Sequence, residues 1–432
     1  MPRNNMLNQI IDLHIHSKYS RACSKHLELP TIATACETRG IDIVVTGDMT
    51  HPAWFASIKE NLVEENSGLY KLANDQSKTR FILGTEVASI KKHKGQTRRV
   101  HLLLFAPTID VAEIFNAELQ RRNFNLTADG RPILGMPSKD ILQMMLDIDE
   151  RMVMIPAHAW TPWFGIFGSK GGYTSLEEAF DELHTNIFAI ETGLSSDPLM
   201  NWRCSMLDNI TMVSSSDAHS LQKLGREANV LQFESKQDIT YDEIMRVLRT
   251  EDKERFLNTI EFYPEEGKYH MDGHRDCGVM MHPVETEKHK GFCPKCAKPL
   301  TIGVMNRVEE MADRTEEEAK VFGADNKVPY TSIVPLPEII ADVYSCGVAT
   351  KRVVRVYELL TQTLGSEFHI LLHASMEDIA AASDTSIADA IDRVRKGHVV
   401  VRPGYAGVIG TVKVFEDSIT VKRNAQLNLQ LD

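Results

Sequence analysis

The chain has 432 residues, which is too long for one ordinary hydrophobic core, so two or three domains are expected. Apolar residues make up 43% and charged residues 25%, as in a globular protein. No run of about 18 apolar residues occurs, and the start MPRNNMLNQ lacks an apolar signal core, so we expect a cytoplasmic protein without a membrane span. The net charge of −12 argues against coating nucleic acid by bulk electrostatics, but not against gripping phosphates with local patches and metal ions.

Short apolar segments recur from residue 10 to about 220 and alternate with amphipathic segments. They are rich in Ile, Val, Leu and Phe and are bounded by turn or cap residues, which is the pattern of buried parallel strands. The segments are QIIDLHIH, IDIVVTGD, RFILGTEVAS, RRVHLLLFAP, RMVMIPAHAW, NIFAIETG and NITMVSSSDAH. We therefore predict an α/β domain, built as a barrel, over residues 1–262.

Polar residues fall within or at the ends of these predicted strands, where a barrel gathers side chains at one rim. They are His14, His16, Asp48, Glu86, His101, His158, Glu191, Asp217 and His219. In a strand, residues i and i+2 face the same way, so His14 and His16 can bind one metal ion, and Asp217 and His219 repeat this spacing. Mixed His, Asp and Glu ligands suit zinc, manganese or iron in a multinuclear site that hydrolyses phosphate esters.

Each of these residues also has a simpler interpretation when it is taken alone. A single histidine such as His101 in VHLLLF is more often a hydrogen-bonded core residue than a ligand. The set as a whole favours metal binding, because an ionised carboxylate in an apolar strand costs several kcal/mol unless a positive charge neutralises it. The role of Glu191 stays open between the metals, a substrate hydroxyl and a helix N-terminus.

The segment from about 263 to 303 is rich in His, Cys, Gly and Pro and has little periodicity. His274-x2-Cys277 and Cys293-x2-Cys296 are separated by fifteen residues, which is the arrangement of a zinc ribbon. His282 competes with His274 as the fourth ligand, and we prefer His274 because the x2 spacing lets both side chains of a tight turn meet one ion. A redox C-x-x-C is the alternative for the cysteine pair.

The remainder, residues 304–432, is predicted to be a mostly helical α+β domain. MNRVEEMADRTEEEAKVFG, PLPEIIADVYSC and SIADAIDRVRKG are predicted helices, and HVVVRP is a predicted strand. An exposed tail is expected at about 424–432.

Two segments beside the predicted metal ligands are candidates for contact with DNA. An aromatic, glycine-rich loop follows His158 and suits stacking on an extruded base, although a hydrophobic lid or core plug is an equal alternative; its residues are Trp160, Trp163, Phe164, Phe167 and Tyr173. A helix should follow this loop at about Leu176, because Ser175 and Glu178 form a capping box.

A basic loop between Glu86 and His101 could hold a DNA backbone, although a solvated hairpin is the alternative. Its residues are Lys91, Lys92, Lys94, Arg98 and Arg99. The segments KRVVR (351–355) and RVRKGHVVVRPGY (393–405) are weaker candidates.

The motifs DLHIHSKYS, VVTGDMTH, GTEV, VHLLLF, PAHAW and SSSDAH resemble those of the polymerase and histidinol phosphatase (PHP) superfamily. The resemblance implies a distorted, (β/α)7-like barrel with a trinuclear metal centre bridged by Glu86. Two departures stand out: Asp48 occupies a position where a histidine ligand is usual, and Ala22 lies near the place of another usual ligand. The expected metal set is therefore two or three divalent ions (Zn, Mn or Mg), held by His14, His16, Asp48, Glu86, His101, His158, Asp217 and His219.

Longer segments are similar to the endonuclease Q family over nearly the whole chain. They are IPAHAWTPWFGIFGSKGGY, ETGLSSDP, YHMDGHRDCG, CPKCAKPLTIGVMNRVEEMADR, VPLPEII and RPGYAGVIG. The resemblance implies a nucleoid-associated repair nuclease that cuts DNA 5′ to deaminated bases (uracil, hypoxanthine, xanthine) and abasic sites. Glu86, Asp217 and His219 would be its catalytic residues, and one structural zinc would bind His274, Cys277, Cys293 and Cys296.

The terminal hexapeptide QLNLQL resembles the motif by which bacterial repair proteins dock on the replication sliding clamp, with Gln426, Leu429 and Leu431 as its anchors. Two other functions remain open. A PHP-type phosphatase acting on a small monoester would fit the metal barrel, although it has no need of the zinc ribbon. A catalytically weak DNA- or clamp-binding scaffold would fit the departure at Asp48.

Overall fold

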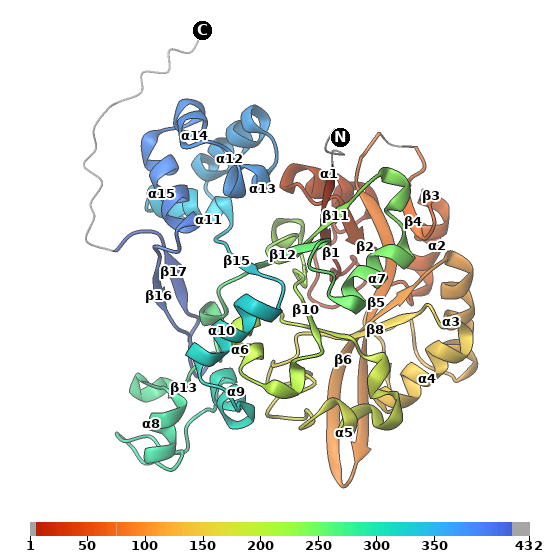
Figure 1. Cartoon of the computed structure of the whole chain (residues 1–432), viewed down its shortest axis with the longest axis horizontal. Coiled ribbons are helices and arrows are strands. Elements are labelled where there is room, and N and C mark those ends of the chain that lie inside the picture. The colour runs from red at the N-terminus through yellow and green to blue at the C-terminus, as the bar shows by residue number, and fades with distance from the viewer. Residues whose placement is uncertain (1–5, 75, 417–432) are drawn as a thin grey trace.

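The computed structural model describes residues 6–74 and 76–416. Within them, the central feature is an eleven-stranded mixed sheet with the order β15-β12-β11-β1-β2-β5-β4-β3, in which β6 and β7 also pair with β5, and β8 pairs with β6 (Figure 1). Its strands are β1 (Leu7–Asp12), β2 (Ile43–Val45), β3 (Leu62–Asn66), β4 (Leu69–Leu72), β5 (Arg80–His93), β6 (Gln96–Ala106), β7 (Ile133–Leu134), β8 (Val153–Pro156), β11 (Ala228–Phe233), β12 (Phe256–Glu261) and β15 (Tyr330–Ser332). Smaller two-stranded sheets pair β9 (Ala189–Glu191) with β10 (Thr211–Val213), β13 (Asp272–His274) with β14 (Val279–Met281), and β16 (Val400–Arg402) with β17 (Thr411–Lys413).

Helices surround the central sheet and form most of the C-terminal part of the molecule (Figure 1). They are α1 (Leu29–Arg39), α2 (Pro52–Asn61), α3 (Ile109–Arg121), α4 (Ser138–Ile148), α5 (Leu176–Phe180), α6 (Pro198–Trp202), α7 (Tyr241–Thr250), α8 (Pro283–Lys288), α9 (Val304–Met311), α10 (Glu316–Asn326), α11 (Leu336–Val343), α12 (Lys351–Leu364), α13 (Glu367–Leu372), α14 (Met376–Ala382) and α15 (Thr385–Arg395). Short 3-10 segments lie at Asp181–Asn186, Ser205–Leu207, Leu221–Lys223, Lys236–Asp238, Pro264–Glu266 and Arg275–Cys277. No helix in the described ranges is long and apolar enough to cross a membrane.

The predicted alternation of strands and helices is confirmed, but the strands are not uniformly parallel. β1–β2, β2–β5 and β9–β10 are parallel, whereas β5–β6 and β6–β8 are antiparallel. Lys94 and Gly95 connect β5 to β6 and have φ values of 47° and 82°. A two-residue turn of this kind reverses the chain, whereas parallel strands need a crossover of a dozen or more residues. The prediction of parallel strands was therefore wrong for this hairpin.

Backbone hydrogen bonds just beyond the strand ends connect the small β9–β10 sheet to the central sheet. The Ala159 N–H, after β8, donates to the carbonyl oxygen of Glu191 at 2.9 Å, and the His16 N–H, after β1, donates to that of Ala218 at 3.1 Å. These bonds bring the segments that follow β1, β8, β9 and β10 to one place, which is where the predicted ligands lie.

The C-terminal elements agree with the predicted helices and strand but do not all separate from the first domain. β15 pairs with β12, so a segment beyond the predicted boundary at residue 304 belongs to the central sheet. Helices α11 to α15 form the compact group at the upper left of Figure 1. An almost fully buried ion pair fastens this group to α1, because Arg39 Nη1 lies 2.9 Å from Glu367 Oε2.

Candidate metal centre

His14 and His16 project side by side from the segment that follows β1, as their spacing predicts. Their ring centroids are 5.2 Å apart, and both residues are at most 1% exposed. Each Nε2 points toward the same pair of carboxylates: Glu86 Oε2 lies 3.8 Å from His14 Nε2 and 3.6 Å from His16 Nε2. Asp217 Oδ1, from the segment after β10, lies 3.5 Å and 3.0 Å from the same two nitrogens.

Glu86 is at the middle of the site. It lies on β5, is 1% exposed, and directs its two oxygens to different partners. Oε1 lies 2.6 Å from His101 Nδ1 on β6 and 3.2 Å from His158 Nε2 after β8, whereas Oε2 faces His14 and His16. One carboxylate between two groups of imidazoles has the placement that a bridging ligand needs.

Seven of the eight predicted ligands assemble into three overlapping groups. Within each group, the ligand atoms lie within 4.8 Å of one another. The groups are His14 with His16 and Glu86, His16 with Asp217 and His219, and Glu86 with His101 and His158. Because neighbouring groups share His16 or Glu86, the arrangement can hold two or three cations close together.

Asp48 differs from the prediction, because it supports His16 instead of joining these groups. Its Oδ1 lies 3.2 Å from His16 Nδ1. Its Oδ2 accepts hydrogen bonds from the Ser17 N–H, the Ser17 hydroxyl and the Ser20 hydroxyl at 2.8, 2.6 and 2.8 Å. With both oxygens engaged, Asp48 orients the imidazole so that Nε2 is left to face the site.

Glu191, whose role the sequence leaves open, occupies the equivalent position behind His14. It is fully buried, and its Oε1 lies 3.0 Å from His14 Nδ1. Its Oε2 accepts a hydrogen bond from the His158 backbone N–H at 2.7 Å. Glu191 thus connects two predicted ligands without being a member of a ligand group.

The residues present fit bound cations. His14 Nε2 and Glu86 Oε2 are both buried and lack a hydrogen-bond partner among the described residues, and they face each other. Burial by itself disfavours protonation of His14, yet Glu191 and Asp217 raise the pKa of His14 well above its ordinary value. Burial likewise would raise the pKa of Glu86, but His101 and His14 hold that pKa well below its usual range. The buried carboxylates therefore require positive charge, which divalent cations would supply in place of protons.

The backbone is strained at three positions of the site. Asp48, His158 and Asp217 have φ values of 46°, 30° and 46°, in the left-handed region that residues other than glycine rarely adopt. Strain of this kind persists only where the surrounding structure enforces it, and it is concentrated at functional sites.

Arg131 also lies at the centre, and sequence reasoning missed it. Its Nη1 is 3.6 Å from Glu86 Oε2, and its side chain is 22% exposed. It lies in the loop between α3 and β7, in the sequence TADGRP, where no strand pattern draws attention to it. The only available signal was a single arginine in a turn-forming segment.

The aromatic loop after His158 divides into buried and accessible residues. Trp160, Phe167 and Tyr173 are at most 3% exposed, so the core-plug alternative describes these three, and they do not offer a surface for base stacking. Phe164 packs on His101 with ring centroids 4.2 Å apart. Trp163 is 46% exposed and keeps the predicted accessibility.

Trp163 borders a cavity of about 470 Å³ beside the metal centre. Tyr269 also lines the cavity and makes an edge-on contact with Trp163, with the ring centroids 5.8 Å apart. The Thr161 side chain also lines the cavity and lies 2.8 Å from His158 Nδ1. This residue therefore joins the cavity wall to the predicted ligands.

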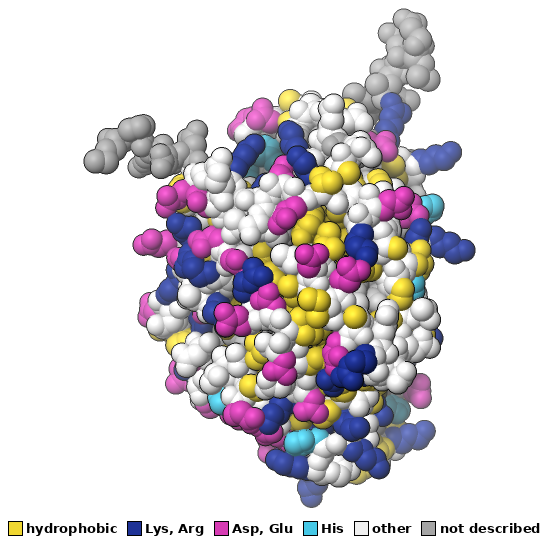
Figure 2. Space-filling model, turned by 90° about the vertical axis from the view of Figure 1, so that its right-hand side faces the viewer, with side chains coloured by type: hydrophobic (Ala, Val, Ile, Leu, Met, Phe, Trp, Pro, Cys, Tyr) yellow, Lys and Arg dark blue, Asp and Glu magenta, His cyan; other side chains and the backbone are white. Residues whose placement is uncertain are grey.

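The basic segment forms the solvated hairpin that was the alternative interpretation. Lys91 and Lys92 are exposed on β5, and Arg99 is partly exposed on β6. Arg98 is held in place, because its Nη2 lies 2.6 Å from Glu178 Oε1 and its guanidinium stacks over Tyr173. Figure 2 shows positive and negative side chains intermixed over most of one face of the molecule, with Lys and Arg side chains more frequent toward its lower end.

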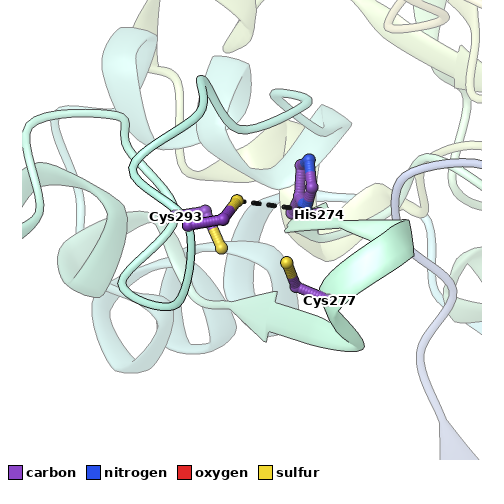
Figure 3. A group of neighbouring side chains, drawn as sticks. His274, Cys277 and Cys293 are labelled. Atoms are coloured by element: carbon purple, nitrogen blue, oxygen red, sulfur yellow. Dashed lines mark hydrogen bonds between the residues drawn. The ribbon is translucent and has the colours of Figure 1, made fainter.

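The cysteine-rich segment brings its four predicted ligands together. His274, Cys277, Cys293 and Cys296 place their ligand atoms within 4.8 Å of one another, and Figure 3 shows the three that are labelled pointing toward a common centre. His282 instead precedes α8 and is outside this group, in agreement with the preference for His274. The hydrophobic cluster behind the site is small, comprising Val279, Met281, Cys293 and Leu300. So small a cluster contributes little stability, and a bound metal ion would add to it.

The proposed clamp motif, with Gln426, Leu429 and Leu431, lies outside the described residues.

Comparison with known proteins adds evidence on the family. The family model for the MJ0043 C-terminal domain matches residues 335–398. The uncharacterized protein YqxK of Bacillus subtilis is 28% identical over 423 residues, covering 93% of this chain and 98% of that protein. The uncharacterized protein MJ0043 of Methanocaldococcus jannaschii is 27% identical over 259 residues, covering 59% of this chain but 31% of that protein.

Two crystal structures resemble this protein over almost its full length. The lesion-specific endonuclease PfuEndoQ from Pyrococcus furiosus is 30% identical, with a TM-score of 0.82 over 94% of this chain and 95% of the other. Endonuclease Q in complex with a 27-mer duplex substrate, with an abasic lesion at the active site, is also 30% identical, with a TM-score of 0.80 over 95% of this chain and 97% of the other. Because sequence identity and fold agree over 94–95% of its length, the chain belongs to the endonuclease Q family.

Proposed function

We propose that this protein is a metal-dependent DNA repair endonuclease that hydrolyses the phosphodiester 5′ to deaminated bases (uracil, hypoxanthine, xanthine) and abasic sites. The observation that carries the proposal is the assembly of seven His, Asp and Glu side chains into three groups that share His16 or Glu86. It occurs in a chain that matches a lesion-specific endonuclease over 94% of its length. The distorted PHP-type barrel and the structural zinc ribbon belong to the same proposal.

Hydrolysis would form a bond between a water oxygen and phosphorus and break the bond between phosphorus and the 3′ oxygen. The leaving oxygen takes a proton, so the products are a 3′-hydroxyl and a 5′-phosphate. Divalent cations, when bound, supply an activated water and neutralise the charge of the phosphate.

The position of each residue indicates its role in this reaction. Glu86 is buried and holds the centre together. Asp217 and His219 have the most exposed side chains of the three ligand groups, at 25% and 32%, so we place the entry of water and phosphate beside them. Glu191 and Asp48 fix the orientation of His14 and His16.

The cavity beside His158 is the proposed place for an extruded base or an empty sugar. Trp163 and Tyr269 offer aromatic surfaces there, and Thr161 connects the cavity to the metal centre. A deaminated or missing base pairs badly, so turning it out of the duplex costs less than turning out a paired one. Selection of the lesion would then be separate from the chemistry.

The deciding experiment incubates the protein with Mg²⁺, Mn²⁺ or Zn²⁺ and end-labelled duplexes that carry uracil, hypoxanthine, an abasic site or only normal bases. We expect a nick on the 5′ side of the lesion. Asp217→Asn should abolish the nick and leave the circular dichroism spectrum unchanged. Rapid release of phosphate from small esters without any nick would instead establish a phosphatase, and metal binding with neither activity would establish a scaffold.

Docking on a sliding clamp remains a prediction from the terminal sequence. Removal of residues 426–432 should leave nicking unchanged and abolish clamp binding; binding that persists would refute the assignment.

A further inference from the structure

Arg131 is the basic side chain that faces the metal centre. In the described ranges, it is the one Lys or Arg whose side-chain nitrogen lies within 4.0 Å of a carboxylate among the eight predicted ligands. Its Nη1 lies 3.6 Å from Glu86 Oε2, the oxygen that also faces His14 and His16. Among the described residues, Glu86 Oε2 itself has no hydrogen-bond partner.

The loop that carries Arg131 is anchored on both sides. Before it, the Gly130 N–H donates to the carbonyl oxygen of Tyr19 at 3.1 Å. After it, the Ala88 N–H donates to the carbonyl oxygen of Pro132 at 3.0 Å, and β7 continues alongside β5. A side chain at position 130 would begin 2.2 Å from Asp48 Oδ2, so only glycine lets the loop approach this closely. The position of Arg131 is therefore fixed by the fold.

The N–H donors of the Arg131 guanidinium take no part in anchoring the loop. Arginine offers five N–H donors, and none of those of Arg131 makes a hydrogen bond to a described residue. Its single ion-pair contact, at 3.6 Å, is too long for a hydrogen bond, and 22% of the side chain is exposed. The guanidinium N–H groups of Arg131 lie beside the predicted metal ligands and are partly open to solvent. They are therefore suited to a planar, bidentate contact with phosphate oxygens.

We propose that Arg131 is a catalytic residue that binds the non-bridging oxygens of the scissile phosphate and stabilises the negative charge that develops on them. This inference rests on the proposed function, because it takes the substrate to be a phosphodiester. The competing role is purely structural: Arg131 would neutralise Glu86 and keep the ligand groups assembled. The two roles differ in what its removal does to metal content.

The test compares Arg131→Ala and Arg131→Lys with wild type in single-turnover cleavage of the abasic-site duplex, together with metal content and thermal unfolding. Arg121→Ala is the matched control, because Arg121 is 71% exposed on α3 and pairs with Glu118. We expect Arg131→Ala to reduce the cleavage rate on the order of 10² to 10³-fold, the usual loss for one transition-state donor, with metal content unchanged. Arg131→Lys should be intermediate, and free guanidinium ion should partly restore Arg131→Ala.

A wild-type rate in Arg131→Ala, or a loss of rate that follows a loss of metal, would overturn the inference. The same variants are assayed on bis(4-nitrophenyl) phosphate, which needs no DNA. If wild type hydrolyses this ester but nicks no DNA, the proposed function fails, and the effect of Arg131→Ala on ester hydrolysis still decides the inference. If wild type acts on neither substrate, both proposals fail.

Discussion

Glu191→Gln tests whether the buried carboxylate behind His14 organises the metal centre. Gln keeps the size of the side chain but removes the charge. Its one amide oxygen can accept only one of the two hydrogen bonds that now come from His14 Nδ1 at 3.0 Å and from the His158 N–H at 2.7 Å, because the amide NH2 group is a donor only. Loss of such a supporting carboxylate usually weakens metal affinity about 10- to 100-fold. This corresponds to about 1.4 to 2.7 kcal/mol of binding free energy.

The assay titrates Mn²⁺ into metal-free protein by calorimetry and measures nicking at each concentration. Cleavage by Glu191→Gln should require more metal and recover toward the wild-type rate at saturation. Glu113→Gln is the control, since Glu113 is exposed and pairs with Lys59. Asp48→Asn should act similarly through His16, and the double variant should deviate from additivity because the His14 and His16 rings are 5.2 Å apart.

Two results would refute this reasoning. Unchanged metal affinity together with unchanged nicking would mean that Glu191 does not support His14. Unchanged affinity with lost nicking at saturating metal would mean that Glu191 acts on the substrate instead.

Three further predictions concern stability. Glu367→Ala removes the ion-pair partner of the nearly buried Arg39 and should lower the free energy of unfolding by about 3–5 kcal/mol in urea denaturation. Glu118→Ala, in an exposed pair, is the control and should not shift the urea midpoint. Equal midpoints for the two variants would contradict the argument. Cys293→Ser should remove one equivalent of bound metal and make residues 263–303 sensitive to protease, and resistance equal to wild type would show that the module does not depend on metal. Burial raises the pKa of Glu261 to about 8. Between its usual value of 4.5 and about 8, the folded state holds a proton that the unfolded state releases, so the free energy of unfolding should fall as pH rises. Glu261→Gln should flatten this dependence of stability on pH, and an unchanged dependence would contradict the assignment.

The candidate site could be predicted well from sequence because its residues occur in short strand segments with period two. His14 and His16 had to share a face, and the x2 spacings around Cys277 and Cys293 had to form turns that present both side chains of each pair. These relations depend on local geometry, which neighbouring residues determine. The same holds for helices α11 and α15, whose apolar spacing is local.

What the sequence could not decide depended on contacts between distant segments. Asp48 and Glu191 carry the same chemical group as Glu86. Only the placement of the segment after β1 beside Asp48, which follows β2, and beside Glu191, at the end of β9, makes these two residues partners of the imidazoles instead of members of the ligand groups. Burial separated Trp163 from Trp160 in one loop of similar aromatic residues. Arg131 reaches Glu86 because Gly130 lets its loop approach Asp48, a distance that no local pattern encodes. The sequence by itself determined the chemistry available to this protein, and the tertiary structure decided which groups meet, because side chains interact over a few ångströms whatever their separation along the chain.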